Sequence, residues 1–309
     1  MLKVESLSRR YGQRLALDEV SFQAERGEII ALLGRNGAGK STLMNVLTGY
    51  LAMSSGRAWV AGYDVQKEPM AARKQTGYLP EQPPLYPDMT VREYLRYCTE
   101  LKGVRREKRK AEIERVIELT GLGEYAARLS GRLSKGYRQR LGVAQAMLGS
   151  PSVLILDEPG SGLDPLQMMQ MRDVVREAGR DCTVLLSSHL LSEVTQVCSR
   201  ALVLDKGVLC YDGAMDDLLF AGGRLHVAIR GGEGIAEALR ALPGVTEVQV
   251  CRKDDCLHAD LRHEAGCDLR GAVFALAVRL NGELLEMYSE TDNLETALVR
   301  LLNEKEAGR

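Results

Sequence analysis

The stretch that decides the fold is Ile29–Ser41, which reads IIALLGRNGAGKS. Its first five residues are apolar throughout, as in a strand covered on both faces. Gly34–Ser41 then follows the pattern G-x-x-x-x-G-K-S, and an apolar helical pattern continues over Ser41–Leu47. Glycines let the backbone wrap a phosphate with successive N–H groups pointing inward, and a helix N-terminus adds positive dipole there. The stretch therefore predicts a nucleotide-binding loop between a buried strand and a helix.

The loop residues have distinct expected roles. Lys40 is expected to reach the β- and γ-phosphates, and the Ser41 hydroxyl can ligate Mg²⁺. The nucleotide-binding residues predicted here are Gly34, Arg35, Asn36, Gly37, Ala38, Gly39, Lys40, Ser41 and Thr42.

A second motif, VLILDEP, occupies Val153–Pro159. Four apolar residues predict a buried strand that delivers Asp157 to the phosphate end of a sheet, where a carboxylate can hold Mg²⁺. Glu158 follows and is placed to orient or deprotonate an attacking water. An Asp-Glu pair alone is usually a solvated strand end. Its combination with the phosphate loop favours the catalytic interpretation.

Strands alternating with helices predict an α/β fold with a parallel sheet. A length of 309 residues suggests two domains. The first is expected over about 1–215, with a helical part at about 88–150, and 216–309 is expected to form a small C-terminal α+β domain after a linker at Ala221-Gly222-Gly223. Further strands are expected at Leu2–Leu7, Leu15–Phe22, Arg57–Val60, Thr183–Ser187, Ala201–Asp205, Leu225–Arg230, Val245–Cys251 and Cys256–Leu261. Further helices are expected at Val91–Leu101, Lys108–Leu119, Gln139–Leu148, Leu166–Glu177, Ile235–Ala241, Leu269–Leu280 and Leu294–Leu302.

Composition narrows the choice of partners. With 41 Lys+Arg against 42 Asp+Glu, the chain has no global basic field, so nucleic acid is not expected as a partner. The basic run KGVRREKRK at 102–110 is either a patch for phosphate groups or a solvated helix face. No apolar run approaches the ~18–20 residues that cross a bilayer, and the start lacks a secretory signal, so a cytosolic protein is expected. Any membrane role would need a separate partner.

The cysteines give little support for a metal site. There are seven, and none forms a C-x-x-C pair. Cys251 and Cys256 with His258 and His263 could be imagined as a cluster, but their spacing matches no common zinc pattern. Reduced thiols of a cytosolic protein are the simpler interpretation.

A third motif is specific. Leu133-Ser134-Lys135-Gly136-Tyr137 lies upstream of the Asp157 strand. With the loop and the Asp-Glu strand, it resembles the signature of the nucleotide-binding subunits of ATP-binding cassette (ABC) transporters, over about residues 2–215. The commonest signature is LSGGQ, so Lys135 and Tyr137 depart from it, whereas Ser134 and Gly136 are kept. Lys135 is expected to alter the affinity for the partner's nucleotide.

The resemblance implies roles for four more residues. Tyr11 matches the aromatic residue that stacks on adenine, and Gln82 matches the glutamine of the Q-loop, which senses Mg²⁺ and couples to the membrane partner. Asp164 matches the D-loop, and His189 matches the switch histidine, which bonds the γ-phosphate.

The family implies a fold and a mechanism. The fold is a P-loop NTPase cassette with a RecA-like core, an antiparallel β subdomain and a helical subdomain. Two subunits, as a homodimer or a paired cassette, sandwich two MgATP head to tail. Ser134 and Gly136 of one then contact the γ-phosphate held by Lys40 of the other. The implied catalytic residues are Glu158, His189 and Lys40, and the implied Mg²⁺ ligands are Ser41, Gln82 and Asp157.

Lys135 and the tail most resemble the exporter branch that serves drug, antibiotic, lipid and polysaccharide permeases. The expected function is ATP hydrolysis that powers export through a separate integral-membrane permease, with the chain peripheral on the cytoplasmic face. The tail is expected to stabilise or regulate the dimer. Two alternatives are a soluble ABC ATPase acting on ribosomes or DNA and a non-hydrolysing cassette. One cassette without a long heptad run disfavours the first, and the presence of Glu158, Gln82 and His189 disfavours the second.

Overall fold

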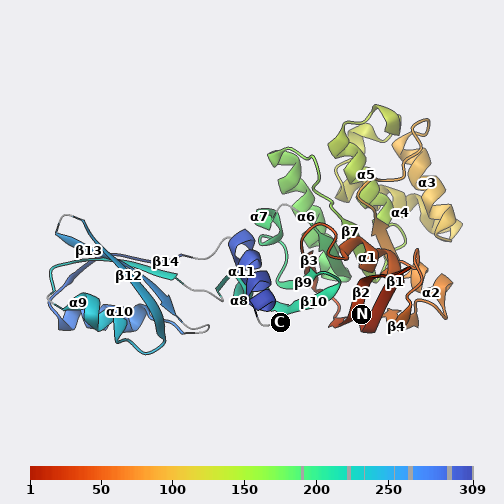
Figure 1. The fold of residues 1–309 in the computed structure, drawn as a ribbon. Coiled ribbons are helices and arrows are strands. Elements are labelled where there is room, and N and C mark those ends of the chain that lie inside the picture. The colour runs from red at the N-terminus through yellow and green to blue at the C-terminus, as the bar shows by residue number, and fades with distance from the viewer. Residues whose placement is uncertain are drawn as a thin grey trace. The chain divides into compact units, whose positions relative to one another are not determined.

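The computed structural model describes residues 1–188, 191–220, 224–232, 234–253, 255–263, 267–290 and 294–307. The chain divides into two compact units, Met1–Gly213 and Ala214–Arg309 (Figure 1). Among the described residues, no helix combines the length and apolar character that a membrane crossing requires.

A six-stranded sheet, parallel from β9 through β6, forms the centre of the first unit. Its strands are β3 (Ile29–Leu33), β6 (Thr76–Leu79), β7 (Val153–Asp157), β8 (Thr183–Ser187), β9 (Arg200–Asp205) and the edge strand β10 (Val208–Ala214), in the order β10-β9-β3-β8-β7-β6. Strand β3 lies between β8 and β9, which explains its continuous apolar sequence. The parallel register pairs Asp157 with Ser187, so the carboxyl ends of β7 and β8 meet at one edge.

A smaller antiparallel sheet holds the helix that follows the loop. It contains β1 (Leu2–Tyr11), β2 (Arg14–Ala24), β4 (Ser55–Val60) and β5 (Tyr63–Asp64), in the order β2-β1-β4-β5. Helix α1 (Lys40–Leu47) buries Leu43, Met44, Val46 and Leu47 in one hydrophobic core with residues of both sheets. Since both sheets pack against it, the N-terminus of α1 is held firmly in place.

The remaining helices of this unit are α2 (Pro69–Lys74), α3 (Val91–Leu101), α4 (Arg106–Leu119), α5 (Lys135–Met147), α6 (Pro165–Asp181) and α7 (Leu191–Val194). Figure 1 shows α3, α4 and α5 gathered apart from β1, β2 and β4. Helix α3 begins with a capping box, in which the Thr90 hydroxyl accepts from the Glu93 N–H while the Glu93 carboxylate accepts from the Thr90 N–H. This cap fixes the start that the sequence predicts.

The second unit contains a four-stranded antiparallel sheet. Its elements are α8 (Met215–Phe220), β11 (Arg224–Arg230), α9 (Ile235–Arg240), β12 (Val245–Lys253), β13 (Cys256–His263), α10 (Arg270–Arg279), β14 (Glu283–Glu290) and α11 (Leu294–Ala307). The element order β-α-β-β-α-β and the strand order β12-β13-β11-β14 are those of the ferredoxin-like split βαβ fold. Helices α9 and α10 cover one face, where Leu225, Val227 and Ile229 join their apolar residues in a core (Figure 1).

Some elements were not predicted. Helix α5 begins at Lys135 and not at Gln139, because the Ser134 hydroxyl accepts from the Tyr137 N–H and caps the helix at the signature motif itself. Strands β5, β6, β10 and β14 and helices α2, α7 and α8 were missed, since they are short or lack a clear period, as ELLEMYSE of β14 shows. The expected linker Ala221-Gly222-Gly223 lies outside the described residues.

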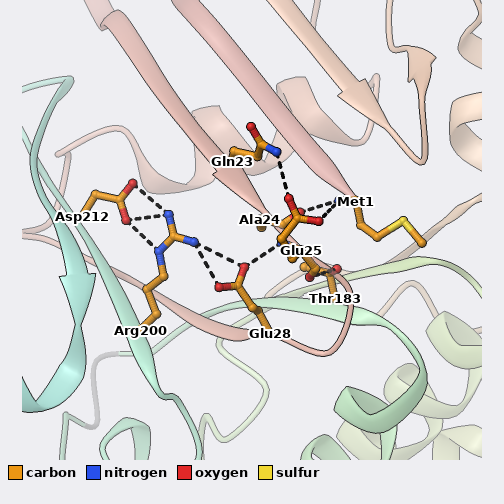
Figure 2. Close-up of polar contacts among 8 residues, drawn as sticks. All are labelled: Met1, Gln23, Ala24, Glu25, Glu28, Thr183, Arg200 and Asp212. Carbon is orange, nitrogen blue, oxygen red and sulfur yellow. Dashed lines mark hydrogen bonds and ion pairs between the residues drawn. The ribbon is translucent and has the colours of Figure 1, made fainter.

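A polar network joins strands at the end of the parallel sheet opposite the loop (Figure 2). The Arg200 guanidinium at the start of β9 donates to the Asp212 carboxylate of β10 at 2.7 Å and to the Glu28 carboxylate before β3 at 3.2 Å. The Thr183 hydroxyl donates to the Glu25 carbonyl at 2.6 Å. The network therefore ties the edge strand β10 to the central strands.

Candidate functional site

The predicted phosphate loop connects β3 to α1, and two glycines explain its shape. Gly34 has a φ of 146°, and a Cβ on it would lie 2.2 Å from the Leu204 carbonyl oxygen. Gly39 has a φ of 110° and directly precedes α1, and a Cβ there would lie 2.7 Å from the Ala16 carbonyl oxygen. Both positions combine a left-handed backbone with a close backbone neighbour, so only glycine fits.

The Lys40 ammonium lies over the loop itself. Its Nζ donates to the Gly34 carbonyl at 2.7 Å and to the Arg35 carbonyl at 3.2 Å. Burial lowers the pKa of Lys40, and the negative charges of Glu158 and Asp157 oppose that shift. The Lys40 ammonium therefore lies in the field of these two carboxylates.

An open pocket of about 680 Å³ contains most of the predicted residues. This volume suits a small-molecule ligand. The pocket is lined by Tyr11, Arg14, Ala16, Asn36, Gly37, Gly39, Lys40, Ser41, Thr42, Glu81, Asp157 and Glu158. Arg14, Ala16 and Glu81 were not predicted. The tight connection from β1 to β2 could have indicated the first two, because it places the start of β2 beside Tyr11.

Ser187 connects the two carboxylate residues and was also not predicted. Its hydroxyl donates to the Asp157 carboxylate at 2.6 Å and accepts from the Glu158 N–H at 3.1 Å. Glu158 has a φ of 52°, which is unusual for a residue with a side chain. The Gln139 side-chain amide donates to the Glu158 carbonyl at 3.1 Å. Hydrogen bonds on both sides of its backbone therefore hold Glu158 in a strained conformation.

The electrostatics extend to Tyr78 on β6. Burial, followed by the negative charge of Asp157, raises the pKa of Tyr78 to about 12. Its hydroxyl donates to the Asn45 side-chain oxygen at 3.2 Å. Tyr78 therefore remains neutral beside the carboxylate and supplies no proton at ordinary pH.

The residues present fit a magnesium ion at this position. The Ser41 hydroxyl and the Asp157 carboxylate line the same pocket, and both are oxygen donors of the kind that Mg²⁺ prefers. Gln82, the third predicted ligand, is exposed and lines a second pocket of about 410 Å³, whereas its neighbour Glu81 lines both pockets. The structure therefore brings Ser41 and Asp157 together but places Gln82 in the second pocket. His189 lies outside the described residues.

Ser134, Gly136 and Asp164 form a separate cluster (the signature cluster) at the starts of helices α5 and α6. Ser134 caps α5, and the Asp164 carboxylate caps α6 by accepting from the Gln167 N–H at 2.8 Å. The Gln167 side chain covers Gly136, so that a Cβ on Gly136 would lie 2.1 Å from it. None of these three residues lines the pocket of about 680 Å³ that contains Lys40 (the loop pocket).

Lys135 contacts the D-loop of its own chain. Its ammonium would lie 2.3 Å from a Cβ built on Gly162, which has a φ of 72°. A side chain at position 162 would therefore displace Lys135. Within one chain, Lys135 connects the signature motif to the loop that precedes α6.

Other candidate sites have less support. Among the described residues, no group of three His, Cys, Asp or Glu side chains is placed to hold a metal ion, so the structure gives the Cys251–His263 alternative no support. Part of the basic run packs the helical region, because the Lys102 ammonium donates to the Ala146 and Leu148 carbonyls at 2.8 and 3.1 Å.

Comparisons with known proteins identify the family. The family model described as ABC transporter matches residues 17–161. The ABC transporter ATP-binding protein YxlF of Bacillus subtilis, whose own role is uncharacterized, is 38% identical over 71% of this chain and 72% of its own length. The linearmycin resistance ATP-binding protein LnrL of the same organism is 29% identical over 97% of this chain and 98% of its own length. A solved ATP-binding subunit of an ABC transporter is 31% identical, with a TM-score of 0.66 over 71% of this chain and 91% of that one.

The α/β fold, the phosphate loop and the Asp-Glu strand define a P-loop nucleotide-binding protein. The chain belongs to the ABC transporter family. It is the ATP-binding subunit, which hydrolyses ATP for transport.

Proposed function

We propose that two cassettes pair head to tail, so that each loop pocket is completed by the signature cluster of the other. The observation that carries this proposal is the separation of the two clusters within one chain. Ser134 and Asp164 are exposed at the N-termini of α5 and α6, and neither reaches the pocket that holds Lys40. Exposed helix N-termini offer N–H groups and positive dipole to a phosphate brought by a second subunit.

Hydrolysis is assigned to Glu158 and Lys40. The oxygen of a water attacks the γ-phosphorus of ATP, the bond to the bridging oxygen breaks, and ADP and phosphate leave. Glu158 accepts the proton of the attacking water, and Lys40 stabilises negative charge on the phosphate oxygens. Ser41 and Asp157 would hold Mg²⁺, which neutralises charge on the β- and γ-phosphates. Tyr11, which lines the pocket, would stack on the adenine.

The assigned partner is an integral-membrane permease on a separate chain, and the direction of transport is export. The name of LnrL, a resistance protein that matches nearly the whole chain, supports export. The subunit then works at the cytoplasmic face of the membrane. The near-neutral charge disfavours the alternative of a soluble cassette acting on ribosomes or DNA. Co-purification with a membrane protein of about six spans would test the assignment.

The site is tested by two substitutions with different outcomes. Glu158→Gln removes the base but keeps the side-chain size, so we expect ATP binding to persist while turnover falls by at least ~100-fold and a nucleotide-bound dimer accumulates. Lys40→Ala removes the ammonium group that lies over the phosphate loop and is expected to weaken ATP binding itself. Glu177→Gln, on the exposed side of α6, is the matched control and should keep normal turnover. Normal turnover in Glu158→Gln would refute the assigned base.

A further inference from the structure

The four-stranded sheet of the second unit (the tail sheet) has two edge strands that differ in charge. Its outer strands are β12 and β14. The sequence of β14, ELLEMYSE, contains three glutamates and no basic residue, so two copies of this edge would repel each other. The sequence of β12, VTEVQVCRK, contains an acid near its start and two bases at its end. An antiparallel pair of β12 strands would bring opposite charges together.

The β12 edge is also exposed and apolar at its centre. Seven of its nine residues are exposed, and Val250 shows 38% of its surface. Such an edge presents unpaired backbone N–H and C=O groups to another strand. The register with β13 pairs Val250 with the buried Ala259, so Val250 lies on the helix-covered face, and Glu247, Cys251 and Lys253 lie on the other face.

We propose that β12 pairs antiparallel with β12 of a second copy, so that the two tail sheets form one continuous sheet. A two-fold axis at Val250 sets Val250 against itself and Glu247 opposite Lys253 of the second copy, at both ends of the pair. Neighbouring registers centred on Gln249 or Cys251 lose this pairing. Charge complementarity therefore favours β12 of a second copy as the partner strand and also sets the register of the pair.

The Glu247 carboxylate is already held in place at this edge. It accepts from the Arg262 guanidinium at 2.9 Å and from the Gln249 side-chain amide at 3.0 Å. Lys253 is exposed at the end of β12 and makes no ion pair with the residues that the structure describes. Pairing of β12 with β14 of another copy would leave one edge of each chain unpaired in a dimer, so it would add further copies into a ring or a filament.

This pairing rests on the proposed function, because it supplies a second contact between two cassettes that already meet at their nucleotides. It also assigns the tail a role as a nucleotide-independent dimerisation element. ATP turnover and tail pairing are measured separately. Normal turnover in Glu158→Gln would refute the catalytic proposal while leaving the tail results unaffected.

The first experiment is cross-linking of the full chain without nucleotide. Val250→Cys is placed in a Cys251→Ser background and oxidised. Directly opposed residues of antiparallel strands have Cα atoms ~4.5–5.5 Å apart, which suits a disulfide. We expect a covalent dimer. Leu285→Cys in the same background is the matched control, because Leu285 is 40% exposed on β14, and it should not cross-link. Equal cross-linking at both positions, or none at Val250→Cys, would overturn the proposal.

The second experiment reverses the charges. Glu247→Lys and Lys253→Glu should each weaken the nucleotide-free dimer about tenfold, because each change places like charges together at both ends of the strand pair. The double variant restores opposite charges and should recover the dimer, which also shows that the exposed edge tolerates both changes. Sedimentation analysis gives the dissociation constants. Unchanged single variants, a double variant as weak as either one, or a monomeric wild-type chain would overturn the proposal.

Discussion

At the residue scale, Lys102 shows that a lysine of the basic run can be buried and hydrogen-bonded within the fold. Its ammonium donates to two carbonyls at the C-terminal end of α5, and burial lowers its pKa to about 8. A lysine whose pKa is lower folded than unfolded binds fewer protons in the folded state. Its charge therefore costs stability below pH 8, and this cost disappears as the pH rises from about 8 toward the unfolded value of 10.5.

We expect Lys102→Met to reveal this cost. The unfolding free energy of the wild type, relative to the variant, should increase by about 2 kcal/mol between about pH 7 and about pH 10. Urea unfolding at the two pH values measures the difference. A relative stability that falls as pH rises would contradict the assigned pKa.

The sequence motifs predicted residues that line the pocket but not the hydrogen bonds that hold those residues in place. Asp157, Glu158, Lys40 and Ser41 could be placed from their motifs, because each motif follows an apolar strand of the right length. Ser187 could not, since its hydrogen bonds to Asp157 and Glu158 depend on β8 lying beside β7. Gln82 was expected with the magnesium ligands, and the course of the loop after β6 places it in the neighbouring pocket.

At the element scale, Arg200 holds three strands together. It bonds Asp212 of β10 and Glu28 beside β3 (Figure 2). Arg200→Met leaves both carboxylates without this partner and should lower the unfolding free energy by about 1–2 kcal/mol, allowing for partial exposure. Arg200→Lys should recover part of this, because an ammonium cannot reproduce the forked geometry. Thermal unfolding measures both.

The control for Arg200 is Arg180→Met. Arg180 pairs only with Glu177 among the described residues, on an exposed helix face, so the loss should be at most ~0.5 kcal/mol. Equal losses for both arginines would show that the strand network adds no stability.

Elements with a strong local signal were predicted well. The bounds of β3, α3 and β8 agree with those expected: β3 is an apolar run, β8 has an apolar centre, and a capping box defines the start of α3. Strand β14 was missed because its sequence has no clean alternation and its extended form depends on pairing with β11. Local pattern cannot report a partner that is more than fifty residues away in the chain.

At the scale of the whole molecule, the nucleotide site and the proposed nucleotide-independent pairing edge lie in different units. Every residue that lines the loop pocket lies within Met1–Gly213. A chain that ends at Gly213 should therefore keep its ATP affinity while its nucleotide-free dimer weakens at least tenfold, since the β12 edge is gone. Calorimetry and sedimentation measure the two quantities. Unchanged dimerisation of the shortened chain would contradict the role assigned to the tail.

The strand order of the tail has an evolutionary consequence. Along the chain, β11 is the first strand of this sheet and β14 is the last. Arg224 at the start of β11 is nevertheless paired directly with Glu290 at the end of β14. On either side in the chain, α8 and α11 pack against each other. The intervening sheet therefore has the architecture of an insertion, joined at one point with its ends adjacent. Recombination can exchange such a module for another whose ends lie equally close, and leave the flanking helices and the ATPase untouched. Relatives can therefore share the ATPase unit and differ in the domain inserted between these two helices.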